Sequence, residues 1–345
     1  MEIPKGIEGS YIETSNNLFF DVKGLLHPHD RKICFIRFYP HPEGDRIKND
    51  RKFKKIYDLN ERYLFLKENY PQYLYFSKEL DMELQGVKIE DIKRIYTPLE
   101  YYRNLSYKNY LSKIEKSSLK LCKLFISEGE IPENSIGITG SPMVGLSNDS
   151  SDIDLIIYGT EINLEFQEKL QEILNKGGLC RKYSLEEFHS HYHWRVGGSN
   201  ISFDDFMKSE QRKLHQGIYN GFEFFIRYIK SPEHWKGSFY DFKFKNCGRI
   251  KLKAEITDDI DSIFTPCSYK IKVIKLLESN IPLNDLNVYD LTEINSFRGR
   301  FCEQAVKGEK VLVEGKLEEV SFQDKETHFR IMLNDQKQDK MLVFA

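Results

Sequence analysis

Residues 136–158 read IGITGSPMVGLSNDSSDIDLIIY, and this stretch decides the fold at the centre of the chain. A short apolar run ends at Gly140-Ser141, a spacer of small residues follows, and Asp152-Ile153-Asp154 then opens a second apolar run. Apolar residues that bound and interleave two acids predict a β-strand. Side chains alternate across a strand, so Asp152 and Asp154 are expected on one face, with Cα atoms roughly 6.5–7 Å apart.

Two carboxylates on one face at the start of a buried strand repel each other, and keeping both charged is costly unless a cation lies between them. Mg²⁺ suits such a site because it takes few carboxylates and completes its shell with water and phosphate oxygens. Gly140 lets the backbone come close to a ligand. The Ser141 hydroxyl and the backbone N–H groups after it can hold a triphosphate, more strongly if a helix begins there.

The order Gly-Ser, spacer (Pro142–Ser151) and Asp-x-Asp in an apolar strand resembles the signature of the DNA polymerase β-like nucleotidyltransferase superfamily. The resemblance covers roughly residues 110–258. It implies a Mg²⁺-dependent enzyme, with one or two ions, that moves a nucleoside monophosphate from a nucleoside triphosphate such as ATP to a hydroxyl and releases pyrophosphate. It also implies site residues: Asp152 and Asp154 as catalytic metal ligands, and Gly140, Ser141 and Ser151 as nucleotide-binding residues.

Members of that superfamily usually carry a third carboxylate on a strand beside the Asp-x-Asp strand. Residues 248–258 alternate cleanly between apolar and polar side chains, which predicts a strand. Glu255 lies on the polar face of that strand and is the first candidate for the third acid. Glu223 is the second candidate, and Asp258 and Asp259 stay open.

Other interpretations stand beside this one. Asp-x-Asp can form a solvated strand entrance, with Gly-Ser as a plain turn. The chain can also be a module that binds a nucleotide or RNA without turnover, or an interaction protein that transfers a nucleotide to a protein partner, as some superfamily members do. The acceptor (an RNA end, a small molecule or a protein) and the base of the triphosphate stay open.

Composition sets limits on the class of protein. The chain has 345 residues, enough for two or three domains. Its formal net charge of -2 at pH 7 gives no overall drive toward nucleic acid or a membrane. No apolar run is long enough to span a bilayer, and the first residues lack the apolar segment of a signal peptide. The six cysteines are scattered without a Cys-x-x-Cys pair, which predicts reduced thiols in a cytoplasmic protein.

Patterning around the central stretch predicts a mixed α+β fold. The expected parts are an N-terminal α+β domain, rich in strands, over residues 1–100, the nucleotidyltransferase core over residues 101–260, and a small β-rich domain over residues 261–345. In the first part, three segments rich in β-branched and aromatic residues predict an antiparallel meander. These segments are residues 10–13, 18–26 and 32–39.

The core is expected to combine helices with strands. Residues 101–130 predict one amphipathic helix, and residues 163–175 predict a second that ends at Gly177-Gly178. Residues 221–230 predict a largely buried strand. The C-terminal part has three further strand-like segments, which favour a small barrel or sheet. An OB-like barrel would bind a nucleic acid or an oligomeric ligand, and the alternative is a structural or dimerisation domain.

Two polar clusters have less specific patterns. Residues 44–55 are rich in Lys and Arg, and the interspersed acids favour a solvated loop over a contact with a phosphate backbone or an acidic partner. His189, His191 and His193 occupy alternate positions. They would share one face of a strand and could bind a transition metal, whereas a helix would scatter them. Surface or packing histidines are the favoured interpretation, because nothing supplies a second cluster.

Overall fold

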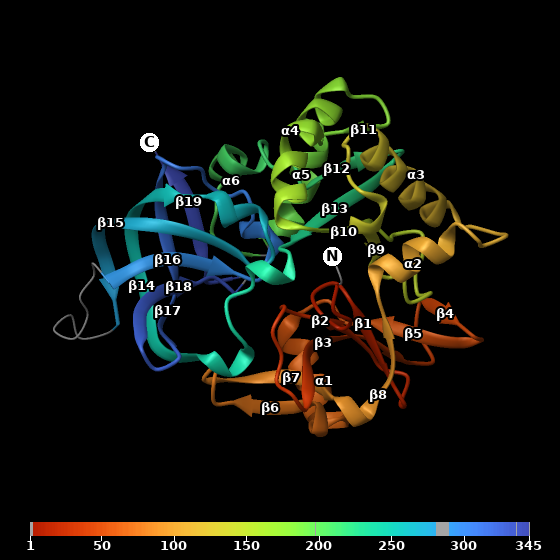
Figure 1. Ribbon diagram of the computed structural model, residues 1–345, viewed down its shortest axis with the longest axis horizontal. Helices are drawn as coiled ribbons and strands as arrows, with labels where there is room; N and C mark the ends of the chain where they lie inside the picture. Colours follow the sequence, from red (N-terminus) through yellow and green to blue (C-terminus); the bar gives the residue numbers. More distant parts are fainter. Residues whose placement is uncertain (1–2, 197, 281–289, 336, 345) are drawn as a thin grey trace. The chain divides into compact units, whose positions relative to one another are not determined.

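The computed structural model describes residues 3–196, 198–280, 290–335 and 337–344. Helices and strands are both abundant, and the strands form three sheets (Figure 1). The predicted α+β class is therefore confirmed. The chain divides into two compact units. The first consists of Met1–Ser77, Met82–Arg181 and Gln216–Phe239, and the second of Lys78–Asp81, Lys182–His215 and Tyr240–Ala345.

An eight-stranded sheet forms the N-terminal part of the first unit. Its order is β4-β5-β3-β2-β1-β8, and β7 joins β3 and carries β6. The predicted meander is confirmed, because β1, β2 and β3 pair antiparallel in chain order. The elements are β1 (Tyr11–Thr14), β2 (Phe19–Val22), β3 (Arg31–Pro40), β4 (Arg46–Lys48), β5 (Arg51–Lys55), α1 (Leu59–Asn69), β6 (Leu74–Ser77), β7 (Met82–Lys88) and β8 (Ile92–Tyr96).

The solvated loop predicted over residues 44–55 is wrong in part. β4 and β5 form an antiparallel hairpin there, and Lys48 pairs with Arg51 in register. Arg46 is almost fully buried, with 2% of its surface exposed. The prediction failed because the local charge pattern cannot show that one arginine of the cluster has buried hydrogen-bond acceptors from another part of the chain.

A five-stranded sheet forms the rest of the first unit, in the order β11-β12-β13-β10-β9. β10 lies between β9, to which it is antiparallel, and β13, to which it is parallel. The predicted strand over residues 221–230 is therefore confirmed, and the predicted Asp-x-Asp strand is confirmed from Ile153 onward, with Asp152 one residue before it. The strands are β9 (Ile136–Thr139), β10 (Ile153–Tyr158), β11 (Cys180–Arg181), β12 (Gln216–Tyr219) and β13 (Phe222–Ile229).

Helices α3 (Lys113–Ser127) and α4 (Thr160–Lys176) pack against one face of this sheet (Figure 1). The ring of Phe125 on α3 lies 5.2 Å from that of Phe166 on α4 and 6.2 Å from that of Phe224 on β13. Phe224 pairs with Ile153, so the odd-numbered residues of β10 face the helices. Asp154 and the other even-numbered residues face the opposite side, which we call the carboxylate face.

The N-terminal segment covers part of the carboxylate face. Ile7 packs with Ile156 and Ile229, and a Cβ atom at Gly9 would clash with the Ile156 side chain. The Thr139 hydroxyl donates a hydrogen bond of 2.5 Å to the carbonyl oxygen of Gly9. These contacts explain why residues 1–77 share a compact unit with the central sheet, a grouping that differs from the predicted boundary at residue 100.

The helix predicted over residues 101–130 is two helices, α2 (Pro98–Leu105) and α3. Ser112 starts α3 with a capping box, in which its hydroxyl accepts from the Glu115 N–H and the Glu115 carboxylate accepts from the Ser112 N–H. The Ser-x-x-Glu signal was present in the sequence and was overlooked. The second predicted helix is confirmed as α4, which ends at Gly177 with a positive φ of 71°.

The second unit contains a barrel. β14, β15, β16, β18 and β17 form a closed ring, because β17 pairs back with β14. β16 and β18 are parallel and the other ring pairs are antiparallel. β19 pairs with residues 310–314 of β17, next to the part of β17 that pairs with β18. The strands are β14 (Phe242–Asp258), β15 (Cys267–Ser279), β16 (Leu291–Ser296), β17 (Lys310–Phe322), β18 (Glu326–Met332) and β19 (Lys340–Phe344).

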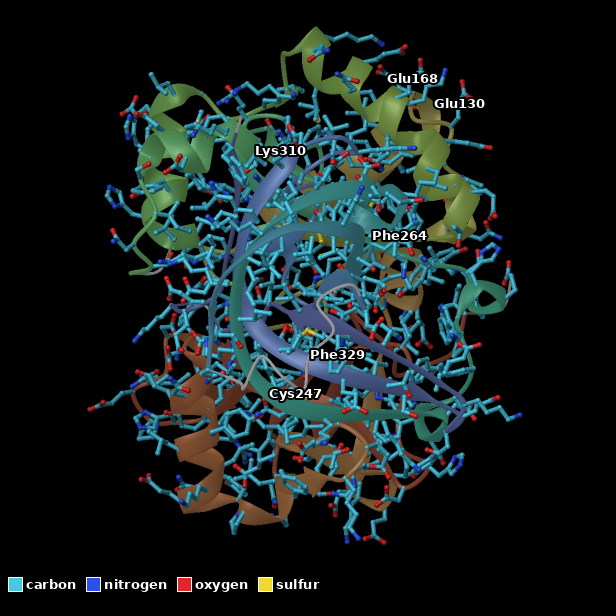
Figure 2. The ribbon with its side chains drawn as sticks, turned by 90° about the vertical axis from the view of Figure 1, so that its left-hand side faces the viewer. Glu130, Glu168, Cys247, Phe264, Lys310 and Phe329 are labelled. Carbon is cyan, nitrogen blue, oxygen red and sulfur yellow. The ribbon has the colours of Figure 1, made fainter. Side chains whose placement is uncertain are left out.

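The barrel interior is apolar. Figure 2 shows β14 and β17 curving around it, with Cys247 and Phe329 labelled at its margin. The alternation predicted over residues 248–258 is confirmed, since Ile250, Leu252, Ala254 and Ile256 of β14 are buried in this interior. The ring agrees with the expectation of a small barrel or sheet, and the OB-like binding role stays a prediction. No helix in the described ranges is long and apolar enough to cross a membrane.

An ion cluster on the barrel leads to a first prediction. Glu293 accepts hydrogen bonds from Lys270 Nζ (2.7 Å) and His328 Nε2 (3.0 Å). Burial raises the pKa of Glu293, but the bonds from His328 and Lys270 outweigh it and lower the pKa to about 2. A lowered acid pKa stabilises the fold above the unfolded value near 4.5, and this stability is lost as the pH falls toward 2.

Glu293→Gln is therefore expected to remove up to about 3 kcal/mol of stability at pH 7, with little difference from wild type near pH 2. Urea unfolding monitored between pH 2 and 7 measures this difference. Glu278→Gln, at an exposed ion pair with Lys251, is the control and should follow the wild-type curve. Equal pH dependence in the two variants would contradict the assignment.

Candidate functional site

Asp152 and Asp154 lie where the sequence placed them. Asp154 is on β10, between Thr139 of β9 and Phe225 of β13, and is partly buried. Asp152 precedes the strand by one residue and is exposed. The two carboxylates therefore stand at the start of a buried parallel strand pair, one accessible from solvent and the other set into the carboxylate face.

Gly140 lies directly against Asp154. Its φ of 77° is in the left-handed region that favours glycine, and a Cβ atom there would clash with Oδ2 of Asp154. The close approach expected for Gly140 is thus present, with the Asp154 carboxylate as the group approached. Residues 141–145 form a turn in place of the helix start considered above, closed by a hydrogen bond of 2.9 Å from Leu146 N to the Ser141 carbonyl.

Ser141 and Ser151 meet across the spacer. Ser141 Oγ donates to Ser151 Oγ at 3.0 Å, and the Asn148 N–H donates to Ser151 Oγ at 3.0 Å. Both serines are buried, with 7% of their surface exposed. Their hydroxyls brace the spacer, which holds the Gly-Ser turn beside Asp154. The nucleotide-binding roles implied for the two serines stay predictions.

The Asp154 carboxylate has an unusual electrostatic environment. Burial and the nearby charge of Asp152 raise its pKa to about 6, although Arg227, Lys55 and Arg37 oppose the rise. Three cations thus fail to offset the effects of burial and of one like charge. A pair of carboxylates in this condition is suited to a divalent cation, which would remove both penalties together.

Sequence reasoning missed these cations. Lys55 is at the end of β5 and Arg37 is on β3, so both come from the N-terminal sheet. Burial, together with Arg37, lowers the pKa of Lys55 to about 8, against the opposing effect of Asp152 and Asp154. The cluster at residues 44–55 was the one available signal for Lys55. Nothing in the local pattern around Arg37 or Arg227 pointed to a site.

The first candidate for the third carboxylate is in a different sheet from the one expected. Glu255 lies on β14, which pairs with β15 and β17 in the barrel of the second unit, and Asp258 and Asp259 lie at and just after the end of that strand. The expected placement beside the Asp-x-Asp strand is therefore wrong for Glu255. An alternating pattern specifies which face of a strand is buried but not which strand it pairs with.

Glu223 has the position expected of the third acid. It is on β13, the parallel neighbour of β10, one residue before the Phe224–Ile153 pair. The pairing begins at Ile153, so Asp152 and Glu223 both lie just before its first pair. Glu223 is exposed.

The three alternate histidines do not form a transition-metal site. Within the described part of the chain, no group of three or more His, Cys, Asp or Glu side chains is arranged to hold a metal ion. His189, His191 and His193 lie on helix α5 (Leu185–Val196), so they spread around it instead of sharing a strand face. His191 is buried and its Nε2 lies 3.0 Å from Glu210 Oε1.

Comparison with known proteins gives one similarity over nearly the whole chain. The chain is 27% identical, over 331 residues, to uncharacterized protein MJ1086 of Methanocaldococcus jannaschii, and the match spans 94% of both proteins. The similarity thus extends over both compact units. No protein-family model and no solved structure matches the chain.

The contact between Gly140 and Asp154 gives a second prediction. Gly140→Ala places a methyl group against the carboxylate in a backbone conformation that alanine avoids, so we expect a loss of about 2–4 kcal/mol in stability. Gly145→Ala is the matched control, because Gly145 has a similar φ of 69° but a Cβ there meets only the Lys48 side chain, at 3.9 Å. Thermal unfolding of both variants measures the difference, and equal losses would show that the Asp154 contact contributes nothing.

Proposed function

We propose that this protein binds a nucleoside triphosphate together with Mg²⁺ at Asp152 and Asp154 and transfers the nucleoside monophosphate to a hydroxyl acceptor. The observation that carries the proposal is the pair of carboxylates at the start of β10 with Gly140 packed directly against Asp154. Burial, together with the charge of Asp152, raises the pKa of Asp154 to about 6, which a purely structural role does not explain.

The residues present fit a Mg²⁺ ion. Asp152 and Asp154 supply hard oxygen donors, and Asp154 is destabilised in its charged form until a cation is added. Glu223, on the strand parallel to β10, is proposed as the third acid. When bound, Mg²⁺ supplies charge neutralisation and a lowered pKa for the acceptor hydroxyl.

The chain's own residues supply position and electrostatics, which dominate phosphoryl-transfer catalysis. In the proposed reaction the acceptor oxygen forms a bond to the α-phosphorus, the bond from that phosphorus to the bridging oxygen breaks, pyrophosphate leaves and the hydroxyl proton is released. Gly140 and the turn over residues 141–145 fix the carboxylate geometry. The Ser141–Ser151 hydrogen bond keeps that turn in place.

The acceptor stays open among an RNA end, a small molecule and a protein. A second proposal, binding of the nucleotide without turnover, is favoured by one specific observation: within the described residues, Glu223 is not assembled with Asp152 and Asp154 into a group of three that could hold a metal ion. Pyrophosphate release separates the two proposals, because the binding module would retain nucleotide affinity and release none.

The test is calorimetric titration of the purified protein with ATP, CTP, GTP and UTP, each with and without Mg²⁺, followed by a pyrophosphate-release assay with RNA and with small hydroxyl acceptors. We expect Mg²⁺-dependent binding of at least one triphosphate, and its loss in a variant that carries Asp152→Ala and Asp154→Ala. Equal binding by wild type and this variant, or binding of none of the four, would refute the proposed function.

A further inference from the structure

The N-terminal sheet packs directly on the Gly-Ser turn. Phe38 of β3 and Phe53 of β5 form one buried cluster with Met143, Val144 and Leu146, which lie in and just after the turn. The face of the sheet that carries these two rings therefore lies next to the candidate site. Any side chain that shares this face near Phe38 is placed to reach the site.

Lys55 shares this face. It is paired directly with Phe38 in the antiparallel register of β3 and β5, and directly paired residues point to the same side. Its ammonium group lies 4.6 Å from the centre of the Tyr57 ring. Lys55 is thus a half-buried cation, close enough to Asp152 and Asp154 for their charges to act on it, yet not neutralised by either.

Arg37 reaches the same region through a β-bulge. Phe19 pairs with Phe38 and Phe20 pairs with Ile36, so Arg37 is the extra residue in β3. A bulge re-aims side chains relative to a regular strand, and bulges are common beside functional sites. The Arg37 guanidinium bonds the Tyr11 side chain and feels the charge of Asp154, and its buried Nε atom has no hydrogen-bond partner.

Two contacts fix the β4–β5 hairpin to the spacer that precedes Asp152. Arg46 Nη1 donates a hydrogen bond of 2.5 Å to the Leu146 carbonyl, and Asn148 Nδ2 donates one of 2.9 Å to Asp45. The hairpin that carries Lys55 is therefore held in a defined place relative to the two carboxylates. Such rigid support is what a binding site needs to orient a ligand.

The charges around the site match one kind of ligand. An ordinary buried ion-pair network would close its carboxylates onto its cations. Among the described residues no ion pair joins Asp152 or Asp154 to Lys55 or Arg37, since Lys55 lies against the Tyr57 ring and the Arg37 Nε atom has no hydrogen-bond partner. A ligand that contains both a cation and a polyanion can pair with the two carboxylates and with the two cationic side chains. A metal-bound triphosphate is such a ligand, because its cation meets the carboxylates and its phosphates meet the cations.

We propose that Lys55 and Arg37 bind the triphosphate of the nucleotide, so that the N-terminal sheet forms one wall of the nucleotide site. This inference rests on the proposed function and adds two positioning residues that the Gly-Ser and Asp-x-Asp stretch does not contain. The test titrates Mg²⁺ with each nucleoside triphosphate, and Mg²⁺ with inorganic tripolyphosphate as a probe that has no base or sugar.

Lys55→Gln is the main variant and Lys54→Gln is its matched control. Lys54 is the preceding residue of β5, exposed and on the opposite face, where it pairs with Tyr39. Lys55→Gln is expected to weaken tripolyphosphate and nucleotide binding by about 10- to 100-fold, since one charge-assisted contact is lost. Lys55→Arg should restore most of the affinity, and Arg37→Lys should reduce it without unfolding the protein, as thermal unfolding will show.

The outcomes separate the two proposals. In one outcome, wild-type protein binds a Mg²⁺-triphosphate, the variant without Asp152 and Asp154 does not, and Lys55→Gln binds as well as Lys54→Gln. The proposed function then stands, and the triphosphate role of the N-terminal sheet is refuted. If wild-type protein binds neither tripolyphosphate nor any nucleotide, both proposals are refuted together. A selective loss in Lys55→Gln with rescue by Lys55→Arg supports the inference.

Discussion

Asp154→Asn is expected to abolish pyrophosphate release, by about 1,000-fold or more, and at the same time to raise the thermal stability of the metal-free protein. If Asp154 holds Mg²⁺ as proposed, its loss weakens binding of the ion whose positive charge would neutralise the reacting phosphates. The gain in stability comes from the same residue, because burial and the charge of Asp152 raise the pKa of Asp154 to about 6, from 3.8 in the unfolded chain.

The direction of the stability change on Asp154→Asn follows from proton linkage. Between pH 4 and 6 the folded protein holds a proton on Asp154 that the unfolded chain releases, so stability falls as the pH rises through this window. The penalty is complete above pH 6, and asparagine does not carry it. We expect Asp154→Asn to gain on the order of 1–3 kcal/mol at pH 8 without Mg²⁺, and nothing below pH 3.8.

Unfolding by urea at pH 3.5 and pH 8, together with the pyrophosphate assay, checks both halves of this prediction. Asp149→Asn, an exposed residue of the same spacer, is the control and should change neither quantity. A loss of stability in Asp154→Asn at pH 8 would show that Asp154 is chiefly an ion-pair partner of Arg227, and the metal-ligand role would then lose its main support.

Local pattern was sufficient for the centre of the site. The apolar run before Gly140 and the interleaved acids at residues 152–154 predicted β9, the turn and β10, since both strands are specified by neighbours in sequence. Strand alternation predicted a shared face for Asp152 and Asp154, and the structure has Asp154 on β10 with Asp152 one residue before it. The contact of Gly140 with Asp154 was only partly anticipated, as a close approach to a ligand.

The features that the sequence did not predict depend mostly on pairing between strands that are far apart in the chain. Residues 248–258 have the pattern of a strand, but their pairing with β17 depends on residues more than fifty positions away. Arg37 is the extra residue where β3 shifts against β2, and its charge acts on Asp154, but no residue type marks that shift in the sequence. The break between α2 and α3 differs in kind, because the Ser112-x-x-Glu115 signal was local and readable.

The second large effect is expected at Glu8, which links the N-terminal sheet to the carboxylate face. Glu8 is fully buried and accepts hydrogen bonds from Arg227 Nη1 (2.9 Å), Lys23 Nζ (3.1 Å) and the Gly24 N–H (2.8 Å). Burial acts to lower the pKa of Arg227, and the charges of Asp21, Glu8 and Asp154 hold it above its ordinary value. The charge of Arg227 is therefore stabilised by carboxylates of the N-terminal part of the chain (Glu8 and Asp21) and by Asp154 of the central sheet.

Glu8→Ala is expected to cost about 3–5 kcal/mol, because it leaves Arg227 buried with less compensation. Glu43→Ala, at an exposed position of the same part of the chain, should cost less than about 0.5 kcal/mol. Urea unfolding at pH 7 compares the two. A cost below 1 kcal/mol for Glu8→Ala would mean that water or Asp21 replaces the lost carboxylate.

The milder Glu8→Gln connects this stability effect to the proposed site. With Glu8 uncharged, Arg227 retains Asp21 at 3.8 Å and is drawn more strongly toward Asp154. Arg227 then competes with a metal ion for the same carboxylate, so Mg²⁺-dependent nucleotide binding should weaken by about tenfold while the fold persists. Unchanged Mg²⁺ affinity in a folded Glu8→Gln variant would show that Arg227 acts on Asp154 too weakly to regulate it, and that Glu8 serves stability alone.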